Sequence, residues 1–186
     1  KESANNSNIL VILDDAYFGL VYEENVLQES LFGHLASLHK NVLAIKVDGM
    51  TKEAFAWGLR VGFVTYGFKG LNDASAEVLE NKTIGAVRAT ISNISTVSQD
   101  IAYNALSSSD FWAQRAQKYA LLREKYGAVK KAIKNEKYAP FFEALPFNSG
   151  YFMCVRLKKH DANKVRLCLL KNHGTGVIAF GDAIRI

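Results

Sequence analysis

The stretch NILVILDD (Asn8–Asp15) holds five consecutive apolar residues between polar ones. Such a run is typical of a β-strand that is buried on both faces, as in a parallel sheet covered by helices. We expect two further strands at residues 41–47 and 60–65, and helices at 25–38 and 71–91. This alternation predicts an α/β layer with a mostly parallel sheet.

The second half of the chain shows a different pattern. Residues 94–111 are rich in serine and small side chains, and no helix or strand is assigned to them. Residues 110–136 have the pattern of one long amphipathic helix, and Asp110 can cap its N-terminus. The rest alternates strand, helix and strand, at residues 151–157, 161–171 and 176–180, with a last strand from Ile184. We therefore expect a domain boundary near residue 110 and a smaller α+β domain after it.

The composition predicts a soluble globular protein. Of the 186 residues, 49% are hydrophobic and 22% are charged, and the net charge is +5. The basic residues are scattered, and their densest groups, Lys130–Lys134 and Lys158–Lys159, fit solvated helix faces better than a nucleic-acid surface. No apolar run approaches the roughly 18 to 20 residues that span a bilayer. We expect neither a nucleic acid nor a membrane as a partner.

The two cysteines, Cys154 and Cys168, are flanked by apolar residues and lack the spacing of a zinc site. They predict core thiols in a reducing compartment, without a disulfide, and a cytoplasmic location. The histidines show no mutual spacing that indicates a metal site. We therefore expect no metal.

The apolar run leads directly into DDAY, residues 14–17. Ligands of open α/β sheets bind outside the carboxyl ends of strands, so an acid and a phenol at this point can reach the same ligand. A carboxylate at this point can keep a heteroaromatic nitrogen protonated, because a nearby opposite charge stabilises the cationic form of a base. Tyr17 can donate to an oxygen on the same ring. The alternative is that an aspartate caps a turn and that Tyr17 only packs.

A lysine and an arginine lie eight residues apart in the apolar, glycine-rich stretch 48–63. An amine such as that of Lys52 becomes a nucleophile toward carbonyls when its surroundings lower its pKa. The guanidinium of Arg60 is always charged and matches the geometry of a phosphate. Together they can hold an aldehyde that carries a phosphate. The alternative is an ordinary surface lysine and an ion-paired arginine.

The order and spacing of these residues resemble the class I/II aminotransferases, a family of fold-type I enzymes that depend on pyridoxal phosphate. The landmarks are Asp14-x-x-Tyr17, then Lys52, then Arg60 followed by a Val-Gly pair. The resemblance implies that Asp14 pairs with the cofactor's pyridine nitrogen and that Tyr17 hydrogen-bonds its ring oxygen. It also implies that Lys52 forms the internal aldimine and that Arg60 binds the cofactor phosphate.

Three other positions are compared with the same family. Arg185 is similar to the arginine that binds the substrate α-carboxylate, a role that suits its bidentate geometry. Residues 87–93 resemble a segment that lends an arginine across a dimer interface to a distal substrate carboxylate, which makes Arg88 a candidate; the alternative is a surface ion pair. The family often has Ser or Thr where this chain has Gly49, so Thr51 is the candidate phosphate hydroxyl, or else a turn residue.

The resemblance covers nearly the whole chain. It implies a partial three-layer large domain followed by a smaller α+β C-terminal domain. Residues 1–109 correspond to the C-terminal half of the pyridoxal-phosphate-binding large domain, and residues 110–186 to a truncated small domain with a linking helix at about 110–136. It further implies a homodimer that acts on α-amino acids and 2-oxo acids.

We therefore expect an aminotransferase that is present here as a fragment, and we expect the fragment alone to be inactive. Two alternatives remain open. One is a related pyridoxal-phosphate enzyme, either a carbon–sulfur lyase or a cyclopropane-forming synthase. The other is a non-catalytic regulatory domain that keeps the aminotransferase scaffold.

Overall fold

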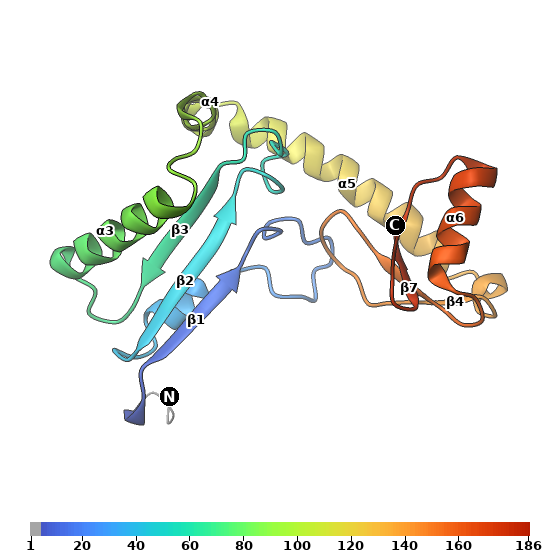
Figure 1. The fold of residues 1–186 in the computed structure, drawn as a ribbon, viewed down its shortest axis with the longest axis horizontal. Helices are drawn as coiled ribbons and strands as arrows, with labels where there is room; N and C mark the ends of the chain where they lie inside the picture. The colour runs from blue at the N-terminus through green and yellow to red at the C-terminus, as the bar shows by residue number, and fades with distance from the viewer. Residues whose placement is uncertain (1–4) are drawn as a thin grey trace. The chain divides into compact units, whose positions relative to one another are not determined.

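The computed structural model describes residues 5–186, which divide into two compact units (Figure 1). The first unit comprises the residues up to Leu20 together with Glu24–Ala116. The second comprises Val21–Glu23 and Gln117–Ile186. The longest helix, α5 (Phe111–Ile133), contributes to both units. Within residues 5–186, no helix is both long and apolar enough to cross a membrane.

The first unit is built on a three-stranded sheet in the order β1-β2-β3. Its strands are β1 (Ile9–Asp14), β2 (Val42–Gly49) and β3 (Gly62–Gly67). β1 runs parallel to β2, whereas β3 runs antiparallel to it, as the arrows in Figure 1 show. The carboxyl ends of β1 and β2 and the start of β3 therefore lie at the same end of the sheet.

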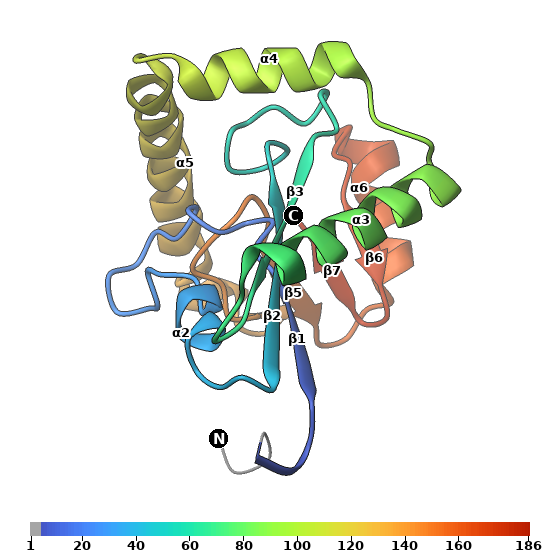
Figure 2. The same ribbon diagram turned by 90° about the vertical axis from the view of Figure 1, so that its left-hand side faces the viewer.

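Helices cover both faces of this sheet. α2 (Phe32–Ala36) packs so closely on one face that a Cβ added at Gly67 would lie 2.7 Å from the Cβ of Ala36. α3 (Asp73–Thr90) crosses the opposite face (Figure 2), and its N-terminus is capped by the Asn72 side chain, which accepts from the amide of Ser75 at 2.9 Å. The sheet is thus the middle of three layers.

Most predicted elements of the first unit are present, but four details differ. Residues 94–111, to which no element is assigned from sequence, contain the helix α4 (Thr96–Ser107). Of the helix expected at 25–38, only α2 (Phe32–Ala36) forms. The sheet is mixed rather than mostly parallel, because β3 is antiparallel to β2. β1 is not buried on both faces, since Leu10 is 56% exposed and Ile12 is 63% exposed.

The second unit is a four-stranded antiparallel sheet packed against α6 and the end of α5. Its core contains Met153, Val155, Ala162 and Ile184. The strand order is β4-β5-β7-β6, and the elements are η1 (Glu136–Tyr138), β4 (Phe142–Ala144), β5 (Cys154–Leu157), α6 (Ala162–His173), β6 (Ile178–Phe180) and β7 (Ala183–Arg185).

Sequence analysis predicts β5, α6, β6 and β7 but misses β4 and η1. α6 begins with a cap, because Asp161 accepts from the amide of Lys164, and it ends at Gly174 in the left-handed region. The expectation of two core thiols is wrong for Cys168, which is exposed on α6, whereas Cys154 is half-buried in β5. The reason is that Cys168 lies on the solvent side of a helix that buries little more than Ala162.

An aromatic cluster holds Val21–Glu23 against α5. The ring of Tyr22 lies 5.6 Å from that of Tyr119 and 5.0 Å from that of Tyr126, measured between centroids. The carboxylate of Glu23 accepts from the hydroxyl of Tyr126 and from Nζ of Lys130. Burial, with smaller contributions from neighbouring tyrosines, raises the pKa of Tyr22 to about 12.

Replacing Tyr22 with phenylalanine should reduce the fall in the free energy of unfolding that accompanies a rise in pH above about 10. Because the folded state raises the pKa of this phenol from 10.0 to about 12, Tyr22 stabilises the fold fully below the lower value and loses that contribution as the pH approaches the higher one. In urea unfolding across this range, the free energy of unfolding should fall more steeply for the wild type than for Tyr22→Phe. Tyr103→Phe, at a site that is 72% exposed, is the control. Equal slopes for the wild type and Tyr22→Phe would contradict the prediction.

Candidate active site

The predicted site residues of the first unit leave the sheet at one end. β1 finishes at Asp14, which is paired in register with Val47 of β2. The next register pair of interest joins Gly49, at the end of β2, to Gly62, at the start of β3. The loop after Asp14 therefore begins at the sheet edge where the turn 50–61 begins and ends, and this edge is where open α/β sheets bind ligands.

The two neighbouring aspartates have different surroundings. Asp15 is half-buried and tied into the fold, because its backbone amide donates to the carbonyl of Val47 at 2.9 Å and its carboxylate accepts from the hydroxyl of Ser30 at 2.5 Å. Asp14 is exposed, and its carboxylate accepts from the backbone amide of Ala16 at 3.2 Å. Because the contact with Ala16 uses only part of the acceptor capacity of this carboxylate, Asp14 can still accept a hydrogen bond from a ligand.

Lys52 lies on a tightly closed turn. The amide of Met50 donates to the carbonyl of Val61 at 3.1 Å, and both side chains are buried in a cluster with Ala102. A Cβ added at Gly49 would lie 2.6 Å from that same carbonyl oxygen, so only glycine allows this approach. The turn is consequently fixed at its base by packing and by backbone hydrogen bonds.

The amine of Lys52 and the phenol of Tyr17 come together from separate loops. The distance from Lys52 Nζ to the centroid of the Tyr17 ring is 5.3 Å. At this separation a lysine ammonium is attracted to the ring face. The structure therefore brings the predicted covalent handle next to the predicted ring-oxygen donor.

Arg60 ends the turn in a strained backbone conformation. Its φ angle is 57°, and that of Phe55 earlier in the turn is 59°, in the left-handed region that side chains other than glycine seldom adopt. Strain of this kind concentrates at ligand sites. The side chain of Arg60 is exposed, and its Nη1 donates to the carbonyl of Trp57 at 3.3 Å. Within residues 5–186 it does not form the ion pair that the alternative interpretation of the sequence expects. Thr51, next to the lysine, is half-buried.

The other two predicted arginines belong to other elements. Arg88 is exposed in the last turn of α3, and its Nη1 donates to the hydroxyl of Ser92 at 2.5 Å. Arg185 is half-buried in β7 of the second unit, with its guanidinium carbon 4.7 Å from the centroid of the Phe152 ring. Within the described residues of the first unit, the predicted cofactor residues that lie at this sheet edge are Asp14, Tyr17, Lys52 and Arg60.

Sequence analysis does not predict one residue that touches this region. Arg115 of α5 donates to the carboxylate of Glu53, which directly follows Lys52, and to the carbonyl of Gly19. A single arginine on a long helix gives no local signal for such a contact. The indirect signal for this contact is the glycine at position 19, whose φ of 84° favours glycine.

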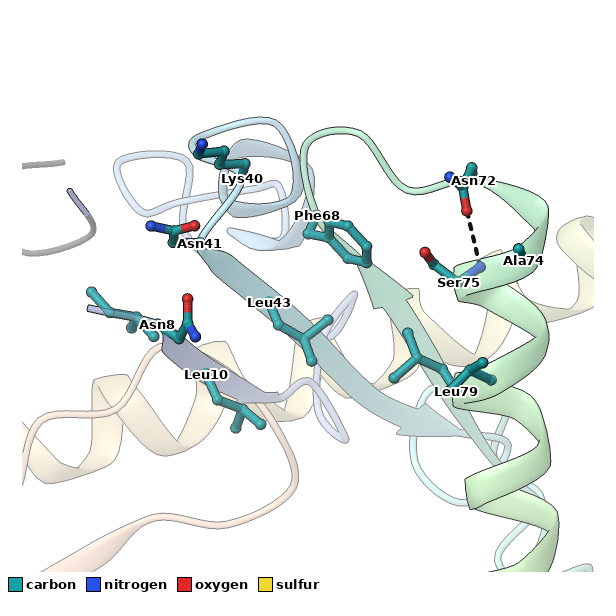
Figure 3. Close-up of a pocket in the computed structure, with 12 residues that line it drawn as sticks. Asn8, Leu10, Lys40, Asn41, Leu43, Phe68, Asn72, Ala74, Ser75 and Leu79 are labelled. Carbon is teal, nitrogen blue, oxygen red and sulfur yellow. Dashed lines mark hydrogen bonds between the residues drawn. The ribbon is translucent and has the colours of Figure 1, made fainter. Parts of the chain in front are cut away.

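A cavity of about 730 Å³ lies away from these residues, between the sheet and α3 of the first unit (Figure 3). Leu43 of β2 and Leu79 of α3 point toward each other across it, with Phe68 at one side. Leu10 of β1 also lines it. The lining of this cavity is mostly apolar and includes none of the predicted cofactor residues, so the cavity is not the candidate active site.

Solved structures share the fold of this chain. An aminotransferase from Anaerococcus prevotii is 21% identical with a TM-score of 0.75, over 100% of this chain and 44% of that one. A Methanococcus jannaschii protein with an active site similar to those of kynurenine aminotransferases is 21% identical with a TM-score of 0.70, over 99% and 46%. The α-aminoadipate aminotransferase LysN from Thermus thermophilus, complexed with N-(5'-phosphopyridoxyl)-L-leucine, is 20% identical with a TM-score of 0.74, over 95% and 44%.

The chain thus spans less than half the length of each of these proteins. No curated protein sequence gives a significant match. The model of the family "Aminotransferase class I and II" matches residues 2–184, almost the entire chain. The chain therefore belongs to the class I and II aminotransferase family.

Proposed function

We propose that this chain is part of a pyridoxal-phosphate-dependent aminotransferase that transfers the amino group of an α-amino acid to a 2-oxo acid. The observation that carries the proposal is the 5.3 Å approach of Lys52 Nζ to the Tyr17 ring, at the sheet end where Asp14 and Arg60 also lie. The family assignment and the phosphopyridoxyl compound in the solved LysN structure support it.

The groups present fit the chemistry of pyridoxal phosphate. An amine can bond the aldehyde covalently, a guanidinium can bind the phosphate in a bidentate manner, and a carboxylate can keep the pyridine nitrogen protonated. Lys52, Arg60 and Asp14 supply these groups from one sheet edge, and the close approach of Gly49 to the backbone of Val61 and Gly62 fixes the base of the turn that carries Lys52. The hydroxyl of Thr51 is proposed to donate a further hydrogen bond to the cofactor phosphate.

Each side chain then has a definite task. When bound, the cofactor acts as an electron sink for the bond between Cα and hydrogen of the amino acid. Once the amino acid has displaced it from the aldehyde, the freed amine of Lys52 would accept the proton from Cα and deliver it to the former aldehyde carbon. Asp14 would hold the positive charge on the ring nitrogen, and Tyr17 would donate a hydrogen bond to the ring oxygen. Arg60 keeps the phosphate fixed, so the ring cannot shift during proton transfer.

The second unit and α3 are proposed to recognise the substrate. Arg185 suits an α-carboxylate, because a guanidinium binds both carboxylate oxygens. Arg88 is proposed to meet a distal carboxylate across the interface of a homodimer. We further propose that the two units are the second half of a larger cofactor domain and most of a C-terminal domain, in a cytoplasmic enzyme.

Covalent trapping tests the central residue. The full-length protein is incubated with pyridoxal phosphate, reduced with borohydride and digested, and the modified peptide is identified by mass spectrometry. We expect the pyridoxyl group on Lys52 and none on Lys52→Ala, with Lys46→Ala labelled like the wild type because Lys46 pairs with Asp48 instead. A label on a different lysine, or none, would contradict the proposal.

Asp14→Asn should impair chemistry far more than binding. An asparagine cannot stabilise a protonated pyridine nitrogen, so the rate of a single-turnover half-reaction with an amino donor should fall by at least about tenfold, or about 1.4 kcal/mol in the barrier. The affinity for pyridoxal phosphate should change much less. The neighbouring Asp15→Asn is the control, since Asp15 is bonded to Ser30 and should affect stability rather than rate. An unchanged rate in Asp14→Asn would reject the assignment.

A further inference from the structure

One guanidinium links the two loops that carry the proposed site. Nη2 of Arg115 lies 2.9 Å from Oε1 of Glu53 and 3.1 Å from the carbonyl oxygen of Gly19. Glu53 is the residue after Lys52, and Gly19 is two residues after Tyr17. The side chains of Arg115 and Glu53 are only 17% and 32% exposed, so this ion pair is largely shielded from solvent.

The backbone at Gly19 is shaped around this ion pair. Its φ is 84°, a conformation that side chains rarely adopt. A Cβ at this position would lie 2.4 Å from Nη2 of Arg115 and 2.6 Å from Oε1 of Glu53. The Tyr17 loop can therefore reach the guanidinium only because residue 19 is glycine, for both conformational and steric reasons.

Arg115 is itself held by a rigid element. It lies about one turn into α5, whose first residue, Phe111, packs against the buried cluster of Met50, Val61 and Ala102. That cluster also forms the base of the Lys52 turn. The indole of Trp112 lies next to the guanidinium, with 5.8 Å between its ring centroid and Cζ of Arg115. The donor is thus anchored to the same core that supports the lysine.

We infer that Arg115 is a positioning residue, which fixes the Lys52 turn relative to the Tyr17 loop through Glu53 and Gly19. The inference rests on the proposed function, because it assigns Arg115 to the support of the reactive amine. Hydrogen bonds between charged groups are among the strongest in proteins, and removing one member of a shielded pair leaves the other charge uncompensated. Loss of Arg115 should therefore loosen both loops together.

The test compares variants of the full-length protein loaded with pyridoxal phosphate. A misplacement of about 1 Å costs roughly a hundredfold in rate, so Arg115→Gln should lower the single-turnover rate about 10- to 100-fold. Cofactor affinity should change little, since Arg60 is untouched. Arg115→Lys should recover part of the rate, because a lysine keeps the charge but not the two-armed geometry. Arg123→Gln, an exposed arginine two turns along α5, should match the wild type.

A double-mutant cycle shows whether the effect passes through Glu53. Arg115→Gln and Glu53→Gln should lower the rate to a similar extent, and the double variant should be little slower than either. Additive losses, or an Arg115→Gln rate equal to that of Arg123→Gln, would overturn the inference. If Arg115→Gln does not fold, Arg115→Lys and Glu53→Gln are compared instead. Lower single-turnover rates in both variants would support the inference, and wild-type rates in both would overturn it.

Borohydride trapping separates this inference from the proposed function. Labelling of Lys52 in the wild type together with an unaffected Arg115→Gln overturns only the role of Arg115. Failure to label Lys52 in the wild type overturns the proposed function itself. In Arg115→Gln we expect Lys52 to remain the labelled residue, and we expect the label to be incorporated more slowly than in the wild type because the amine is less well placed.

Discussion

The pairing of β2 with its two neighbours determines where every proposed cofactor residue of the first unit lies. Parallel register with β1 sets Asp14 opposite Val47, and antiparallel register with β3 sets Gly49 opposite Gly62. A slip of one residue in either ladder would turn the side chains to the opposite face. The loop with Tyr17 and the turn with Lys52 both leave from this edge, so their meeting depends on that register.

Much of the fold of the first unit follows from local sequence. The apolar run before Asp14 predicts β1, and helical periodicity predicts α3 to within two residues. Three features depend on contacts that no local pattern encodes. α4 is stabilised by Ala102 and Ala105, which pack on the core that also supports the lysine turn. The turn 50–61 reverses the chain and so makes β3 antiparallel to β2. The apolar run of β1 does not reveal that Leu10 and Ile12 are exposed on one face.

The candidate site divides in the same way. Asp14, Tyr17, Lys52 and Arg60 are predicted from residue type and spacing, and the structure brings these four to one sheet edge. Their roles remain predictions. Arg115 could not be predicted, because 62 residues separate it from Glu53 and nothing in the sequence of its helix distinguishes it from an arginine on the surface such as Arg123. The strained φ angles at Phe55 and Arg60 are likewise visible only in three dimensions.

A crystal structure of the full-length protein grown with pyridoxal phosphate tests the central claim most directly. Our account predicts continuous electron density from Nζ of Lys52 to the aldehyde carbon of the cofactor. It also predicts that a carboxylate oxygen of Asp14 lies at hydrogen-bonding distance from the pyridine nitrogen, about 3 Å, and that Arg60 lies against the phosphate. A cofactor joined to another lysine, or bound away from this sheet edge, would contradict the account.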